Sequence, residues 1–423
     1  MLLIKNTMII DPKSKTERLG DLLIRGEKIA RIDDFIEATE DMKVIDGTGL
    51  CVGPGLVDVH VHFRDPGLTY KEDIETGAAA AAAGGFTTVV MMANTKPAID
   101  SVETLTYVLE KGKATGIHVE TCACVTKGMK GKELVDMELL KAHGAIGFTD
   151  DGAPLLEVEV VKEAMKLVEE LNVPISFHEE NPKFIANNGV NKGKASEYFS
   201  IGGSSREAEI DMVSRDIELV KEIGADINIQ HISAKEAVEL VRAGKKMGAN
   251  VFAEATPHHF ALTEEAVIKH GTLAKMNPPL RTQEDRIAII EGLVDGTIDM
   301  IATDHAPHSV DEKNKPIAEA PSGIIGLETA LPLAITHLVE PRYLTLVELM
   351  EKMSYNPAKL YHLDRGYIEK GGLADLVIFD PNEVCEVTSG ASKSCNSPFI
   401  GQALQGVVKY TICKGKIVFS GKE

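Results

Sequence analysis

Histidine and aspartate residues recur directly after short apolar segments in the middle of the chain. His60 and His62 close the first of these segments and lie two positions apart, so on a strand both would point to the same side. Later segments end in Asp150-Asp151, His178, His231 and Asp304. Imidazole nitrogens together with carboxylate oxygens are ligands that suit Zn²⁺. The joint pattern therefore predicts a metal site, although any one of these histidines alone would fit an ordinary core position.

A pair of metal ions needs a shared anionic ligand, and Asp150 and Asp151 are the candidates. Consecutive residues on a strand face opposite ways, so only one of the two can point toward the metals, and the spacing does not choose between them. A metal pair would turn a bound water into hydroxide near neutral pH and would polarise a carbonyl group. Asp304, after the last segment, would accept the proton and return it to a leaving nitrogen.

The elements that must position these side chains alternate between strands and helices. Helices are expected between the strands, for example at 78–83, 158–171, 206–223 and 234–247. The eight expected strands are 56–62, 87–94, 117–125, 145–151, 174–180, 227–233, 249–257 and 299–305. Eight strands, most followed by a helix, fit a (β/α)8 TIM barrel whose strand ends form one mouth. A doubly wound open sheet uses the same units, but no GxGxxG motif follows the first strand.

Both ends of the chain differ from the middle, because they consist of short apolar runs with glycine or Asp-Pro between them. Near the C-terminus, Cys413-Lys414-Gly415 separates two such runs and indicates a hairpin. We therefore expect an α/β protein with a TIM barrel at 53–365. A small β-sandwich domain would be formed by the N- and C-terminal segments, 1–52 and 366–423.

The composition excludes several classes of function. The 423 residues include 45 Lys and Arg against 64 Asp and Glu, a net charge of −19. This balance disfavours nucleic acid and anionic membrane surfaces as partners, while a few cations in one pocket would still bind an anionic small molecule. There is no apolar run of 18 residues, no leader-like start and no CxxC pair among the six cysteines. We expect a cytoplasmic protein with plain thiols.

Several longer strings resemble motifs of one enzyme family. The string PGLVDVHVH at 54–62 is similar to the opening motif of the amidohydrolase superfamily of cyclic amidases. Others narrow the resemblance to the dihydroorotases: FRDPG at 63–67, KED at 71–73, Asn94-Thr95 with Pro97, NPPLR at 277–281 and TDHAPH at 303–308. The resemblance covers essentially the whole chain, including its β-rich ends.

Dihydroorotases interconvert N-carbamoyl-L-aspartate and (S)-dihydroorotate, the third step of de novo pyrimidine (UMP) biosynthesis. The resemblance implies a hydrolase of cyclic amides that uses metal-bound hydroxide, with Asp304 as general acid and base. It assigns His60, His62 and Asp304 to a first zinc ion, and His178 and His231 to a second. We therefore expect two zinc ions per subunit, with a single zinc ion as the alternative. In the long-chain branch that this sequence resembles, Asp151 would bridge the metals. Other branches use a carboxylated lysine, and 145–151 contains none.

The resemblance also implies the substrate contacts, which are His62, Arg64, Asn94, Asn277, His308, Ser322 and Gly323. Arg64, Asn94 and His308 would bind the ring carboxylate, because arginine forms bidentate pairs with carboxylates. Arg64 has a plainer interpretation as a surface ion pair, and Asn277 as a turn residue before Pro278. The polar stretch 309–321 is either a mobile lid or an ordinary connection.

Two alternatives remain open. A hydantoinase or allantoinase would be expected to bring a lysine to the fourth strand. A non-catalytic subunit that scaffolds aspartate transcarbamoylase would be expected to have lost metal ligands, whereas all six are present here. The family suggests a homodimer, with possible association with aspartate transcarbamoylase.

Overall fold

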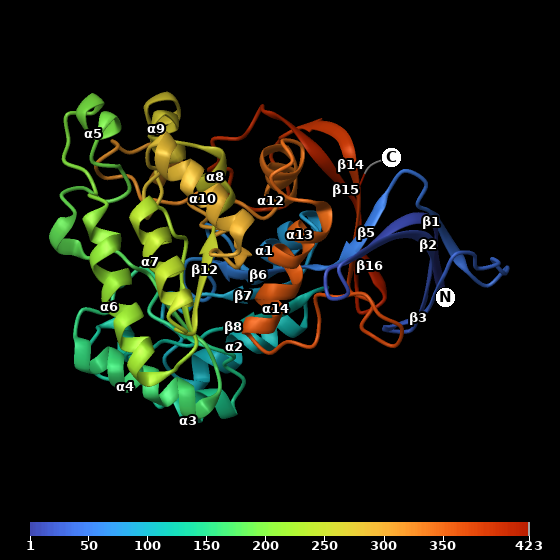
Figure 1. The fold of residues 1–423 in the computed structure, drawn as a ribbon, viewed down its shortest axis with the longest axis horizontal. Coiled ribbons are helices and arrows are strands. Elements are labelled where there is room, and N and C mark those ends of the chain that lie inside the picture. Colours follow the sequence, from blue (N-terminus) through green and yellow to red (C-terminus); the bar gives the residue numbers. More distant parts are fainter. Residues whose placement is uncertain (422–423) are drawn as a thin grey trace.

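The computed structural model describes residues 1–421 and contains a barrel and a large β-sheet beside it (Figure 1). The barrel strands are β6 (Leu56–Val61), β7 (Phe86–Met91), β8 (His118–Thr121), β9 (Phe148–Thr149), β10 (Ile175–Phe177), β11 (Ile227–Ile229), β12 (Val251–Ala255) and β13 (Met300–Ile301). They form two parallel runs, β6-β7-β8 and β9 to β13. Single parallel bridges, Ala123 to Phe148 and Val61 to His305, join the runs into a closed ring. The expected TIM barrel is confirmed.

Helices cover the outside of the ring. Those between the strands are α1 (Ile74–Ala83), α2 (Val102–Lys113), α3 (Met137–Ala142), α4 (Val158–Leu171), α6 (Glu207–Ile223), α7 (Lys235–Lys246) and α10 (Gln283–Asp295). Their apolar faces explain this layer. In α4, for example, Val161, Ala164, Met165 and Val168 are buried at helical spacing. Because helices cover the outer face and side chains fill the inside, β6 and β7 are buried along their whole length.

Shorter helices lie in two of the connections between barrel strands and after β13, the last of these strands. They are α5 (Lys194–Tyr198), α8 (Pro257–Ala261), α9 (Glu264–His270), α11 (Val310–Lys313), α12 (Ala330–Ala334), α13 (Leu346–Met350) and α14 (Asn356–Leu360). Five-residue π-helical stretches follow α12 and α13.

Both ends of the chain enter one eight-stranded sheet, in which blue N-terminal and red C-terminal strands lie together on the right of Figure 1. Its strands are β1 (Leu2–Asp11), β2 (Thr16–Arg25), β3 (Lys28–Asp33), β4 (Lys43–Asp46), β5 (Cys51–Pro54), β14 (Leu376–Glu386), β15 (Ala403–Cys413) and β16 (Lys416–Ser420). β5 pairs with β1 on one side and β14 on the other. Gly55 alone separates β5 from β6, so the sheet is attached directly to the first barrel strand.

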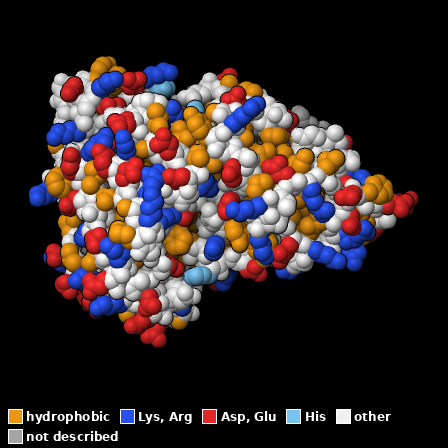
Figure 2. Space-filling model, in the orientation of Figure 1, with side chains coloured by type: hydrophobic (Ala, Val, Ile, Leu, Met, Phe, Trp, Pro, Cys, Tyr) orange, Lys and Arg blue, Asp and Glu red, His pale blue; other side chains and the backbone are white. Residues whose placement is uncertain are grey.

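The charged side chains on the surface are mixed in sign. Figure 2 shows acidic and basic side chains interspersed over the face in view. Within residues 1–421, no helix has the length and apolar character that crossing a membrane requires.

Candidate metal centre

The candidate ligands all lie at the carboxyl ends of barrel strands, which form the mouth where TIM barrels carry their active sites. His60 is within β6 and His62 directly follows it, while the others follow β9, β10, β11 and β13. All six side chains are buried. The backbone is strained at two of them, since φ is +34° at His231 and +47° at Asp304. Non-glycine residues hold such angles where the surrounding structure forces them, which is common at functional sites.

Asp151 lies at the centre of the cluster. Its Oδ1 is 3.5 Å from Nε2 of His60, 3.6 Å from Nδ1 of His178 and 3.8 Å from Nε2 of His231. Its Oδ2 is 3.4 Å from Nε2 of His62. One carboxylate therefore faces both pairs of histidines, as a bridging ligand would.

Asp304 closes the other side of the first histidine pair. Its Oδ1 is 2.9 Å from Nε2 of His62 and 3.5 Å from Nε2 of His60. The three groups of potential ligands that the structure brings together are His60-His62-Asp151, His60-His231-Asp304 and Asp151-His178-His231. The six residues expected from the sequence thus form one continuous cluster.

The atoms of the cluster fit a bound cation. Nε2 of His60 and Oδ1 of Asp151 are buried and have no hydrogen-bond partner among the described residues. Nδ1 of His178 lies 2.9 Å from Nε2 of His231, so two ring nitrogens face each other. Unpaired buried polar atoms are destabilising, and a divalent cation between them would satisfy them all.

Outer hydrogen bonds orient three of the rings. Nδ1 of His60 is 3.0 Å from Oε2 of Glu254, and Nδ1 of His62 is 2.9 Å from Oδ1 of Asn94. Nε2 of His178 is 3.0 Å from Oε2 of Glu180. With these nitrogens donating outward, the other nitrogen of each ring presents a lone pair to the cluster, an arrangement typical of metal ligands. Sequence reasoning missed both glutamates, although Glu180 lies two positions after His178 and could have been expected on the same side.

The charges of the cluster stabilise one another. Burial acts to raise the pKa of Asp151, but His60, His178 and His231 hold it well below its usual value. Burial likewise acts against protonation of His178, yet the nearby carboxylates of Asp151 and Glu180 raise its pKa to about 10. The carboxylates are thus ionised and the site attracts positive charge, which a metal ion would supply.

Asp150 points away from this cluster. Its Oδ1 accepts hydrogen bonds from the backbone N–H groups of Val125 (2.8 Å) and Thr126 (3.1 Å), and the Thr126 hydroxyl donates to its Oδ2. The geometry therefore separates the two consecutive acids: Asp150 ties β9 to the loop after β8, and Asp151 faces the histidines.

We predict that Asp150→Ala destabilises the protein without emptying the metal site. The substitution leaves three buried donors unpaired, so the free energy of unfolding should fall by about 3 kcal/mol. Urea denaturation measures this change, and elemental analysis measures the metal content per chain. Loss of metal at unchanged stability would contradict the assignment of Asp150 to a structural role.

A cavity of about 210 Å³ lies over the cluster. Six predicted substrate contacts line it: His62, Arg64, Asn94, Asn277, His308 and Ser322. Gly323 does not line the cavity. It lies behind His308, where an added Cβ would be 2.6 Å from Cδ2 of that ring. Only a glycine allows this close approach.

Two polar groups at this cavity have hydrogen-bonding capacity that residues 1–421 leave unused. Arg64 donates from Nε to the carbonyl of Pro307 at 3.3 Å, and among residues 1–421 it forms no ion pair with a carboxylate. Oδ1 of Asn277 is buried and has no hydrogen-bond partner in the same residues. A half-buried guanidinium and a free amide oxygen suit a ligand that carries both an anionic group and an N–H group.

The polar segment 309–321 is held closely against the site. Nζ of Lys275 donates to the carbonyls of Ile317 and Ala320, both at 2.7 Å. Nζ of Lys313 donates to the carbonyls of Pro321 and Gly323, both at 3.0 Å. Two buried lysines therefore hold the segment in place, and α11 forms part of it.

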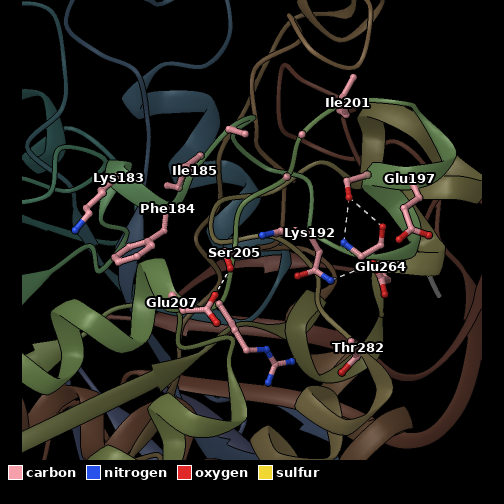
Figure 3. A pocket seen from close by; sticks show the side chains of 17 residues that line it. Lys183, Phe184, Ile185, Lys192, Glu197, Ile201, Ser205, Glu207, Glu264 and Thr282 are labelled. Atoms are coloured by element: carbon pink, nitrogen blue, oxygen red, sulfur yellow. Dashed lines mark hydrogen bonds between the residues drawn. The ribbon is translucent and has the colours of Figure 1, made fainter.

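A larger cavity, of about 1010 Å³, lies apart from the metal cluster (Figure 3). Its lining contains no histidine or cysteine and none of the candidate ligands. Two of its three acidic side chains already have partners, since Glu264 accepts from Asn191 at 3.0 Å and Glu207 from Ser205, and the third, Glu197, is exposed. Size alone does not locate the chemistry of this protein.

Comparisons with known proteins agree with this geometry. A family model described as "Amidohydrolase family" matches residues 51–418. An L-hydantoinase from Arthrobacter aurescens superposes with a TM-score of 0.89 at 26% identity, over 100% of this chain and 96% of that one. A dihydropyrimidinase from Brevibacillus agri, at 22% identity and a TM-score of 0.86 over 100% and 95% of the two chains, shows the shared fold. The chain belongs to the amidohydrolase family.

Its sequence relatives define the branch. A dihydroorotase of Clostridioides difficile is 56% identical over 420 residues, which are 99% of this chain and 100% of that protein. A dihydroorotase of Clostridium acetobutylicum is 52% identical over 424 residues, with full coverage of both chains. Within the amidohydrolases, the chain is therefore a member of the dihydroorotases, as the motifs predicted.

Proposed function

We propose that this enzyme interconverts N-carbamoyl-L-aspartate and (S)-dihydroorotate with the help of bound zinc. The observation that carries the proposal is the unpaired Arg64 guanidinium in the same small cavity as the His and Asp cluster. A cyclic amide with a ring carboxylate would place its anionic group on Arg64 and its scissile bond over the cluster. The membership in the dihydroorotases supports this substrate.

The donor set fits zinc, which would be held by His60, His62, Asp151, His178, His231 and Asp304. When bound, the metal supplies an activated water and polarises the ring carbonyl. Asp304 is ionised, because His60 and His62 lower its pKa against the effect of burial. In ring opening, Asp304 accepts the proton of the attacking water and delivers it to the departing ring nitrogen. Both steps need its carboxylate at the cluster.

Arg64→Lys should raise KM for dihydroorotate about tenfold and leave kcat within about threefold of wild type, because lysine cannot form the bidentate contact. Steady-state kinetics in both reaction directions measure the effect. Arg342→Lys, at an exposed position, is the matched control. An unchanged KM in Arg64→Lys would mean that another group binds the carboxylate.

A substrate comparison tests the proposal against other cyclic amidases. The purified enzyme is given dihydroorotate, a 5-substituted hydantoin and allantoin, and products are separated by chromatography. We expect turnover of dihydroorotate alone. Turnover of the hydantoin without dihydroorotate would reject the proposal, and no turnover of any substrate with metal bound would favour a non-catalytic subunit.

The remaining parts of the proposal come from the resemblance to the family. The first is the number of zinc ions, which is two per subunit or one. The others are a homodimer, association with aspartate transcarbamoylase and a location in the cytoplasm. Metal content per chain, measured with activity, tests the first. Sedimentation of the protein alone and with aspartate transcarbamoylase tests the next two.

A further inference from the structure

Lys71 is a buried cation beside the cavity that the sequence motifs did not explain. It lies between β6 and α1 and is 7% exposed. Its Nζ is 2.8 Å from Oε1 of Glu312 and 3.2 Å from Nδ1 of His308. We propose that Lys71 is a positioning residue that fixes the tautomer of His308 and adds a second cation for the substrate carboxylate. This inference rests on the proposed dihydroorotase activity.

The hydrogen bonds around His308 determine which ring nitrogen carries the proton. The Lys71 ammonium group has donors only, so Nδ1 of His308 must accept from it. The proton of the neutral ring is then on Nε2, which lies 2.9 Å from the carbonyl oxygen of Ser322 and donates to it. Because His308 and Ser322 both line the cavity, this hydrogen bond fixes how the ring lies at the cavity wall.

The ring has little freedom to choose another arrangement. Gly323 packs against the Cδ2–Nε2 edge of His308, with room for no side chain. The backbone N–H of His308 donates to Oδ1 of Asn396 at 3.0 Å, and Nδ2 of Asn396 donates to the carbonyl of Gly323 at 3.0 Å. Asn396 lies between β14 and β15, so the sheet domain helps to hold this edge of the site.

The charges around the ring favour a bound anion. Burial and the cations Arg64 and Lys71 lower the pKa of His308 to about 2, so the ring stays neutral. Glu312 is ionised, since hydrogen bonds from Lys71 and Ser309 overcome burial and lower its pKa to about 2. Glu312 neutralises one of the two cations, Arg64 and Lys71. The other positive charge remains available to bind an anionic ligand, although the net charge of the whole protein is −19.

Without Lys71 the tautomer would change. Oε2 of Glu312 is 3.5 Å from Nδ1 of His308, so a proton on Nδ1 would be donated to this carboxylate. Nε2 would then present a lone pair to the carbonyl oxygen of Ser322, and the hydrogen bond that holds the ring at the cavity wall would be lost. The loss of Lys71 therefore removes a cation from beside the cavity and frees the His308 ring that lines it.

The test compares Lys71→Met with Lys71→Arg and with Lys96→Met, a control that removes the same charge from an exposed position on a neighbouring loop at the mouth. In Lys71→Met, KM for dihydroorotate should rise at least about tenfold, which is 1.4 kcal/mol, with kcat within about threefold. Lys71→Arg should restore most of the affinity, and Lys96→Met should behave as wild type.

Binding measurements separate carboxylate recognition from general damage to the site. By calorimetry, Lys71→Met should bind orotate at least about tenfold more weakly and bind uracil, the same type of ring without the carboxylate, as wild type does. Equal losses for both ligands, or an unchanged KM, would overturn the inference. A wild-type enzyme that does not turn over dihydroorotate would instead reject the proposed function.

The tautomer can also be measured without any change at Lys71. In ¹⁵N-histidine-labelled wild-type protein, the His308 signals, identified by their absence in His308→Gln, should show the proton on Nε2. A proton on Nδ1 would overturn the inference even if Lys71→Met failed to fold. In a folded Lys71→Met variant, the proton should move to Nδ1.

Discussion

Asp304→Ala should lower kcat at least about 10³-fold, because general acid–base catalysis and an anionic ligand are lost together. Oδ1 of Asp304 lies within 3.5 Å of Nε2 of both His60 and His62. No other carboxylate lining the cavity is free to take over, since Asp151 is surrounded by four histidines. Steady-state kinetics with dihydroorotate, together with metal content per chain, measure the result.

Two further variants separate the roles of this carboxylate. Asp304→Asn keeps an oxygen ligand but cannot shuttle a proton, so it should retain metal and remain nearly inactive. Asp311→Ala removes an exposed acid from α11 near the same mouth and should leave kcat unchanged. Near-normal kcat in Asp304→Ala with metal still bound would show that another group moves the proton.

The barrel could be predicted because several of its strands are buried apolar runs. β6 and β7 are buried at every residue, and such runs stand out in the sequence whatever they pair with. β4 and β5 were not predicted. β4 alternates charged and apolar residues over four positions, and β5 ends in Gly53-Pro54, which reads locally as a turn. These two segments become strands because they pair with β1 and β14. Pairing between segments that are far apart in the chain is difficult to predict from the sequence.

The candidate ligands could be predicted for a similar reason, since their positions at strand ends follow from the barrel. The choice between Asp150 and Asp151 could not, because it depends on how the chain turns after β9. Glu254 and Lys71 were missed for a related reason. Glu254 orients His60 from 194 positions away, and Lys71 contacts His308 from 237 positions away. Such supporting roles arise only when the closed ring brings distant loops together.

Removing the metal should have the second large effect, on both activity and stability. After exhaustive chelation we expect kcat to fall at least about 10²-fold and to return when Zn²⁺ is added. Because the metal binds only the folded site, its removal should also lower Tm, by about 10 °C. Thermal unfolding with and without chelator, alongside activity, measures both.

Asp151→Ala provides the matched variant, because it removes the one carboxylate that faces both histidine pairs. The variant should contain less metal per chain than wild type and should show little further loss of Tm on chelation. Asp150→Ala, one position away, should lose stability but keep its metal and its response to chelator. If the two variants behaved alike, the opposite orientations of these neighbouring acids would not matter to the site. A chelator effect that is large in wild type and Asp150→Ala but small in Asp151→Ala can arise only from metal held at the centre of the cluster.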